Sequence, residues 1–114
     1  MLRRLLIIAA LALLSACTVW PIGEDPYGQE VRRNANEVVM ALQAYHRDAG
    51  TFPATLQGLV PKYLPELPDE PRLQYDRDIG SLAFRYTPSW PQLRPVWCST
   101  AGNTTDWHCN EHLL

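Results

Sequence analysis

The residues best suited to chemistry lie near the end of this 114-residue chain, at Cys98, His108, Cys109 and His112. Side chains of these types do one of two things. Two thiols can be oxidised to a disulfide, or thiolates and imidazoles can together bind a metal ion such as zinc. Zinc needs four converging ligands with the thiolates kept reduced, and this spacing matches no common zinc module. The pattern favours a Cys98–Cys109 disulfide, with a metal site as the alternative.

The other candidate ligands are carboxylates of a type that suits calcium, at Asp69, Glu70, Asp76 and Asp78. They lack the spacing of an EF-hand, so a solvated turn is the simpler interpretation, and calcium binding at the Asp76/Asp78 turn stays open. No serine lies in a Gly-x-Ser-x-Gly setting, and His46 has no acid–base partner in the sequence. We therefore predict that the protein is not an enzyme and has no cofactor.

Three tryptophans, at positions 90, 97 and 107, accompany the cysteines. They could form an exposed binding face for a small ligand or for an inhibited enzyme. Aromatic residues in the strands of a small sheet are more often core residues or cross-strand partners. Both interpretations remain open at the level of sequence.

The N-terminus has the pattern of an export signal. A basic start precedes the apolar run 5–14, which as a helix would span about 15 Å, half of the hydrocarbon core of a bilayer. The run ends in Leu14-Ser15-Ala16-Cys17, which resembles the lipobox of bacterial lipoproteins. The resemblance implies that residues 1–16 are a signal peptide and that Cys17 is acylated on its thiol and on its new amine. Thr18 then favours the outer membrane, facing the periplasm.

An acylated Cys17 changes what the remaining sequence implies. Two thiols are left, at Cys98 and Cys109, in a compartment that oxidises them, so a disulfide is favoured again. Cleavage removes two of the ten basic residues and none of the twelve acidic ones, so the net charge falls from −2 to −4. No basic cluster remains to bind nucleic acid. We expect a membrane anchor and an envelope protein as partner, whose identity the sequence does not indicate.

An amphipathic helix is the element on which the mature domain depends. The segment 17–28, with its prolines and glycines, is predicted to be a tether, and Asp25 or a neighbour is a candidate helix cap. We expect the helix to begin at Gln29 and to end at Gly50 in a left-handed conformation. Small or apolar side chains recur along one stripe, at Val31, Ala35, Val38, Leu42, Tyr45 and Ala49.

The chain after Gly50 must cover this stripe. Residues 56–60 predict a short helix, and Tyr63, Leu64 and Leu67 extend the cover. Two hairpins follow, 73–75 with 82–86 and 96–100 with 105–109. Leu82, Phe84 and Tyr86 are expected to face the helix. Counting back from a turn at 101–104, we place Cys98 opposite Cys109.

The segment from Ala41 to Pro53, which ends in Tyr45-His46-Arg47-Asp48-Ala49-Gly50-Thr51-Phe52-Pro53, resembles the head of type IV pilins and type II secretion pseudopilins. In that family a helix ends in Tyr-x-x-Asp-x-Gly-x-Tyr/Phe-Pro. A Gly-Leu step and a Tyr-Leu…Leu-Pro stretch follow, here Gly58-Leu59 and 63–68. The match covers about residues 31–87. The Asp-Pro-Trp-Gly that commonly follows is here only Asp69-Glu70-Pro71, and the family's Gly/Phe cleavage site and long apolar helix are absent.

These patterns predict one α+β domain over residues 29–114, with an amphipathic helix packed on a small antiparallel sheet and a disulfide-closed C-terminal hairpin. The function that they favour is non-enzymatic binding or scaffolding by an envelope lipoprotein, accessory to a secretion or pilus system. An ordinary filament subunit is excluded, because those assemble through the long apolar helix. The alternative is an inhibitor or small-ligand-binding lipoprotein that uses the Trp-rich hairpin.

Overall fold

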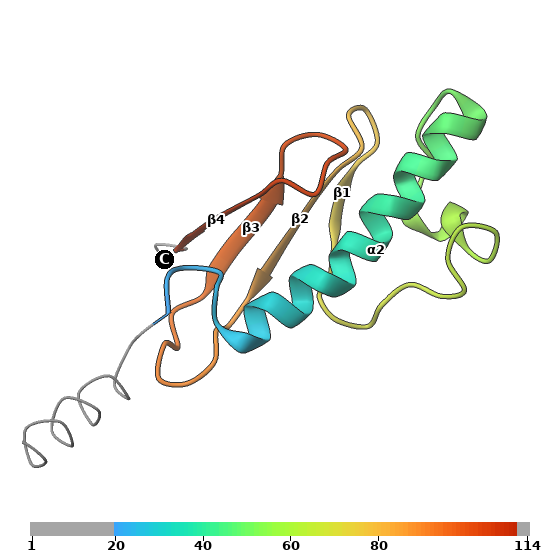
Figure 1. Cartoon of the computed structure of the whole chain (residues 1–114). Coiled ribbons are helices and arrows are strands. Elements are labelled where there is room, and N and C mark those ends of the chain that lie inside the picture. Colours follow the sequence, from blue (N-terminus) through green and yellow to red (C-terminus); the bar gives the residue numbers. More distant parts are fainter. Residues whose placement is uncertain (1–19, 112–114) are drawn as a thin grey trace, which may run out of the picture.

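The computed structural model describes residues 20–111, so the predicted signal peptide, Cys17 and His112 lie outside the described residues. Its elements in chain order are helix α2 (Pro26–Ala49), the 3-10 helix η1 (Leu56–Leu59), and strands β1 (Gln74–Asp76), β2 (Ser81–Tyr86), β3 (Val96–Thr100) and β4 (Trp107–Glu111). One long helix lies across a four-stranded antiparallel sheet (Figure 1). The predicted α+β class is confirmed.

Helix α2 begins at Pro26, earlier than the predicted Gln29. Asp25 is the N-cap, and its Oδ2 accepts a hydrogen bond from the Gly28 N–H at 3.0 Å. Proline suits the first helical position because its missing N–H would have no partner there. Gly50 ends the helix at φ 75°, in the predicted left-handed conformation, and its N–H donates to the carbonyl of His46.

The strands form a meander in the order β1-β2-β3-β4. Successive side chains of a strand point to opposite faces. On the face toward α2, β2 and β3 bury Leu82, Phe84, Tyr86, Val96, Cys98 and Thr100. The prediction that the β2 residues face the helix is therefore confirmed. The other face, called the uncovered face below, has no described helix over it (Figure 1).

Two apolar clusters attach α2 to the rest of the domain. In the first, Leu42 packs with Leu59 of η1, Leu64 and Leu82, as predicted. In the second, the N-terminal half of α2 packs on the sheet through Val31, Ala35, Phe84, Tyr86, Val96 and Cys98. The predicted stripe is buried from Val31 to Leu42, but Tyr45 is only half-buried and Ala49 is exposed, because the last turn of α2 extends beyond its cover.

The second hairpin has the predicted pairing but not the predicted turn. Cys98 lies opposite Cys109, and the last pair is Thr100 with Trp107, so the connection is the loop 101–106. A turn at 101–104 would instead have set Cys98 opposite Trp107. Thr104 forms hydrogen bonds within this longer loop. Its hydroxyl donates to the Ala101 carbonyl at 2.7 Å and accepts from the Asp106 N–H at 3.2 Å.

Residues 20–25 pack on the domain, although the sequence predicts a tether there. Arg32 Nη2 donates to the Gly23 carbonyl at 2.6 Å, and Gln92 Nε2 donates to the Trp20 carbonyl at 2.7 Å. This segment is thus bound to the domain at Trp20 and at Gly23. Within residues 20–111, no helix is both long and apolar enough to cross a bilayer.

Candidate binding surfaces

The uncovered face of the sheet is the first candidate surface. Its side chains are exposed or half-buried and form two cross-strand rows, Gln74–Ala83–Ser99–His108 and Arg85–Trp97–Asn110. Arg85 lies directly opposite Trp97. Arginine and tryptophan are the residue types that most often dominate the binding energy of protein interfaces. The face is therefore chemically suited to a protein partner.

The three tryptophans considered in the sequence lie on different parts of the domain. Trp107 points toward α2, where its Nε1 donates to Asn36 Oδ1 at 2.6 Å and its ring packs edge-on against Phe84. Trp97 lies on the uncovered face, and Trp90 lies in the β2–β3 loop with 78% of its surface exposed. Across residues 20–111, the three do not combine into one Trp-lined site.

The predicted disulfide is present. The Sγ atoms of Cys98 and Cys109 are 2.03 Å apart, and Cys98 is fully buried beneath α2. His108 points to the uncovered face, because neighbours on a strand alternate sides, and its Nε2 lies 3.7 Å from Asp106 Oδ2. Among the described residues, no three histidine, cysteine or acidic side chains are grouped as metal ligands. His112, the remaining ligand of the metal alternative, is outside them.

The acidic residues do not converge either. Asp76 caps the β1–β2 turn, where its Oδ1 accepts from the Asp78 N–H at 2.9 Å. Asp69 and Glu70 are exposed in the loop before β1. An aspartate that binds the backbone two residues on is typical of a turn. Its place in the turn therefore accounts for Asp76 without a bound calcium ion.

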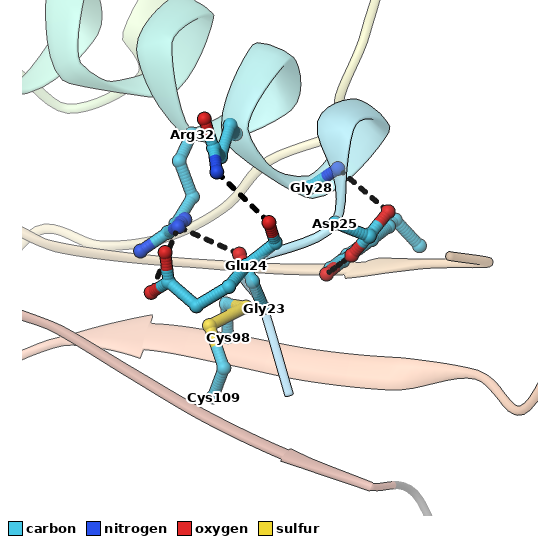
Figure 2. Close-up of polar contacts among 9 residues, drawn as sticks. Gly23, Glu24, Asp25, Gly28, Arg32, Cys98 and Cys109 are labelled. Atoms are coloured by element: carbon cyan, nitrogen blue, oxygen red, sulfur yellow. Dashed lines mark hydrogen bonds and ion pairs between the residues drawn. A yellow bond between two sulfur atoms is a disulfide. The ribbon is translucent and has the colours of Figure 1, made fainter. Parts of the chain in front are cut away.

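The most extensively bonded carboxylate is that of Asp25, which is buried where α2 meets the end of β2. Besides capping the helix, it accepts from the Tyr86 hydroxyl at 2.7 Å, the Ser89 N–H at 2.9 Å and the Ser89 hydroxyl at 3.2 Å. Figure 2 shows Asp25 and Gly28 at the start of the helix. The sequence indicated Asp25 or a neighbour as the cap but did not indicate these partners, which are more than 60 residues away along the chain.

These contacts determine how Asp25 ionises. Burial alone raises the pKa of the Asp25 carboxyl, but the hydrogen bonds from Ser89, Tyr86 and Gly28 outweigh it, so the pKa lies below its ordinary value. Burial and the adjacent carboxylate raise the pKa of the Tyr86 hydroxyl. Both Asp25 oxygens are occupied and the residue is 1% exposed, so the group holds the fold together and has no access to a substrate.

Arg32 binds Gly23 and Glu24, which lie beside this carboxylate (Figure 2). The Arg32 guanidinium reaches the Gly23 carbonyl and lies 3.3 Å from the Glu24 carboxylate. Gly23 has φ 83° and packs over the disulfide, where a Cβ would meet Cys109 Sγ at 3.0 Å. A glycine is needed at this point for both its conformation and its size.

A cavity of about 320 Å³ lies between this N-terminal segment and the β2–β3 loop. Its lining is mainly apolar, with contributions from Ile22, Pro91 and Leu93. Arg94 and Glu111, which form an ion pair at 3.5 Å, also line it. This end of the domain therefore combines apolar groups with a balanced pair of charges.

Comparison with known proteins identifies no relative. No known protein family, no curated protein and no solved structure matches the chain.

Proposed function

We propose that this chain is a lipoprotein of the bacterial envelope, held at the outer membrane by an acylated Cys17 and facing the periplasm. Its pilin-like domain binds a protein partner of a secretion or pilus system and acts as a scaffold, not as an enzyme. The observation that carries the proposal is the lipobox Leu14-Ser15-Ala16-Cys17 directly ahead of a domain that contains a disulfide.

The disulfide supports an envelope location. Cytosolic thiols are kept reduced, whereas the bacterial periplasm oxidises them. The bond joins facing residues of β3 and β4 beneath the first turns of α2, so it belongs to the folded core of the domain. The disulfide in this core would therefore form most readily after export to the periplasm.

The pilin-like assignment is supported by the order of elements after α2. The helix ends at Gly50, and Phe52 follows and packs closely on Gly80. The 3-10 helix Leu56–Leu59 and the residues Tyr63 and Leu64 then cover the helix, and an antiparallel meander completes the domain. This is the order that the resemblance to pilin heads implies.

The uncovered face is the surface that we assign to the partner. Small side chains such as Ala83 and Ser99 leave the sheet accessible, and Arg85 and Trp97 supply a charged group and a large aromatic group side by side. An exposed arginine beside a large aromatic side chain is a combination that often contributes strongly to the binding energy of protein interfaces.

Photo-crosslinking in the native bacterium tests this function. A crosslinking amino acid at Ser99 of the full chain should capture one partner, identified by mass spectrometry as a secretion or pilus component. The matched control carries the same group at Glu37, on the exposed face of α2, and should not capture it. The adduct should also be lost in the Cys17→Ser chain, which is no longer held at the membrane.

Other crosslinked products would contradict the partner surface or favour the alternative function. Equal capture from Ser99 and Glu37 would contradict a partner on the uncovered face. Capture of a hydrolase or a toxin would instead support the inhibitor function, and loss of that enzyme's activity on adding the purified lipoprotein would establish it.

A further inference from the structure

The largest exposed apolar side chains of the described domain are concentrated at one end. Trp20, Ile22, Trp90 and Leu93 are 37%, 45%, 78% and 60% exposed. The other two large exposed apolar residues, Met40 and Ile79, lie on α2 and at the β1–β2 turn. Single exposed apolar residues are common on protein surfaces, but a group of four from two short segments indicates an interaction surface.

The two segments that carry these four residues lie against each other, and the four are called the anchor-end patch below. Gln92, between Trp90 and Leu93, donates to the Trp20 carbonyl, and Ile22 and Leu93 line the same cavity. The loop 87–95 and residues 20–25 lie together at the end of the sheet where α2 begins (Figure 1). Contact between the segments therefore creates a surface that neither would form alone.

We propose that the anchor-end patch rests on the phospholipid surface, with its tryptophans in the headgroup region. This inference rests on the proposed acylation of Cys17 and adds an orientation to it. The lipid anchor and the patch would then bind the same membrane, and the domain would lie against the bilayer in one pose.

Chain length supplies the first argument. Trp20 is three residues after Cys17, and an extended chain spans at most about 3.6 Å per residue, so their Cα atoms lie within about 11 Å. Acyl chains on Cys17 must enter the hydrocarbon core. The headgroup layer beyond that core is only about 5–8 Å thick on each side. Trp20 is therefore in the headgroup layer or immediately outside it, whatever path the intervening residues take.

Side-chain chemistry supplies the second argument. Tryptophan is enriched where membranes meet water, because its ring is largely apolar and its N–H needs a polar partner. The patch contains two, Trp20 and Trp90, with Ile22 and Leu93 beside them. Nearby Arg94 is paired with Glu111, so the surface lacks the basic excess of an electrostatic membrane site. Binding should thus be apolar and insensitive to salt.

Rigidity supplies the third argument. Arg32 donates a hydrogen bond to the Gly23 carbonyl, and Gln92 donates one to the Trp20 carbonyl. Asp25 accepts a hydrogen bond from Ser89, which lies in the loop that carries Trp90. The patch is therefore formed before it meets the membrane, and little conformational freedom is lost on contact. A flexible tether at residues 20–25 would have left the domain free to tumble.

Fluorescence quenching tests the proposal. The lipidated full-length protein is placed in phosphatidylcholine vesicles whose acyl chains carry bromine near the headgroup, a quencher of tryptophan at short range. We expect strong quenching in the wild type. The double variant Trp20→Phe/Trp90→Phe should be quenched no more than in unbrominated vesicles, because its remaining tryptophans, Trp97 and Trp107, lie on the sheet. The matched control Trp97→Phe should retain the quenching, and added salt should not change it.

The outcomes distinguish membrane contact by the anchor-end patch from membrane anchoring through Cys17. Proximity to Cys17 alone brings Trp20 near the headgroups, so the deciding variant is Trp20→Phe, in which Trp90 is the remaining tryptophan of the patch. If this variant floats with the vesicles but is not quenched, Cys17 anchors the domain and the patch proposal is wrong. Equal quenching of the double variant and the control would contradict it as well. A wild-type protein that mass spectrometry shows to be without acyl groups, and that does not float, would overturn the proposed function itself. Leu93→Ser, at an exposed position, should weaken the quenching and offers a variant with little risk to folding.

Discussion

At the scale of single residues, the carboxylate of Asp25 joins the start of α2 to Tyr86 at the end of β2 and to Ser89 in the loop that follows. An aspartate before a proline is a recognisable helix cap, so Asp25 could be identified as one. Its bonds to Tyr86 and Ser89 could not, because they depend on how β2 and the following loop pack against α2. Local signals specify caps and turns, whereas contacts between distant segments follow only from the packed structure.

The low pKa of Asp25 predicts a dependence of stability on pH. Because the folded pKa lies below the unfolded value, Asp25 adds stability above about pH 4, and this is lost as pH falls through the folded pKa. Denaturant unfolding of the wild type and of Asp25→Asn should therefore differ by about 2–3 kcal/mol at pH 7. The difference should shrink steadily below about pH 4. A difference that is constant from neutral to acid pH would contradict the assignment.

Gly28 gives a second prediction at this scale. Replacing glycine with alanine inside a helix normally stabilises it by about 1 kcal/mol. At Gly28 the new Cβ would lie 2.6 Å from Asp25 Oδ1 and 2.8 Å from Tyr86 Cζ, so the carboxylate and the tyrosine must move apart. We expect Gly28→Ala to lower the thermal midpoint, while Arg33→Ala on the exposed surface leaves it nearly unchanged. A stabilised Gly28→Ala protein would show that the Asp25–Tyr86 contact contributes little.

At the scale of elements, the features that follow from hydrophobic periodicity were predicted correctly, whereas element ends and loop lengths were predicted less well. The stripe from Val31 to Leu42, the left-handed Gly50 and the alternation of β2 all follow from repeating local patterns, and all are present. The sequence did not correctly predict three features, namely the first residue of α2, the packing of residues 20–25 and the length of the loop 101–106. Their bounds depend on side chains such as Arg32 and Thr104, which bind carbonyl groups and produce no periodic signal.

The packing of α2 can be tested by two substitutions on its opposite sides. Leu42 is fully buried with Leu59 and Leu82, so Leu42→Ala should cost about 2–5 kcal/mol of unfolding free energy. Arg47 is exposed, and Arg47→Ala should cost less than about 0.5 kcal/mol. Urea unfolding measures both. Similar losses from the two variants would contradict the assignment of buried and exposed sides.

The hairpin gives the second prediction for an element. The bond between Cys98 and Cys109 spans 11 residues, and closing a loop of this size stabilises by about 3 kcal/mol in the chain-entropy model. Protein purified from the envelope should have the two cysteines linked and be two hydrogens lighter than the reduced form. Reduction should lower the thermal midpoint. Free thiols with a stoichiometric amount of bound zinc would instead favour the metal alternative.

At the scale of the whole molecule, α2 runs from one end of the domain to the other. Its 24 residues extend about 36 Å from the anchor-end patch to Gly50 and the loop that follows it. If the patch lies on the membrane, η1 and the β1–β2 turn are held away from it, and the uncovered face is open to proteins alongside. The contacts that hold residues 20–25 on the domain would thus determine which surfaces a partner can reach.

The anchor itself is the last prediction. Cys17→Ser removes the thiol that would be acylated, so the variant should lose labelled fatty acid and appear in the soluble periplasmic fraction, whereas the wild type sediments with membranes. The described domain begins after Cys17, so the Cys98–Cys109 bond should still form and can be verified by mass spectrometry. The matched control, Cys98→Ala/Cys109→Ala, should keep its label, because those thiols are outside the lipobox. Label and sedimentation that persist in Cys17→Ser would show that another feature of the chain holds it to the membrane.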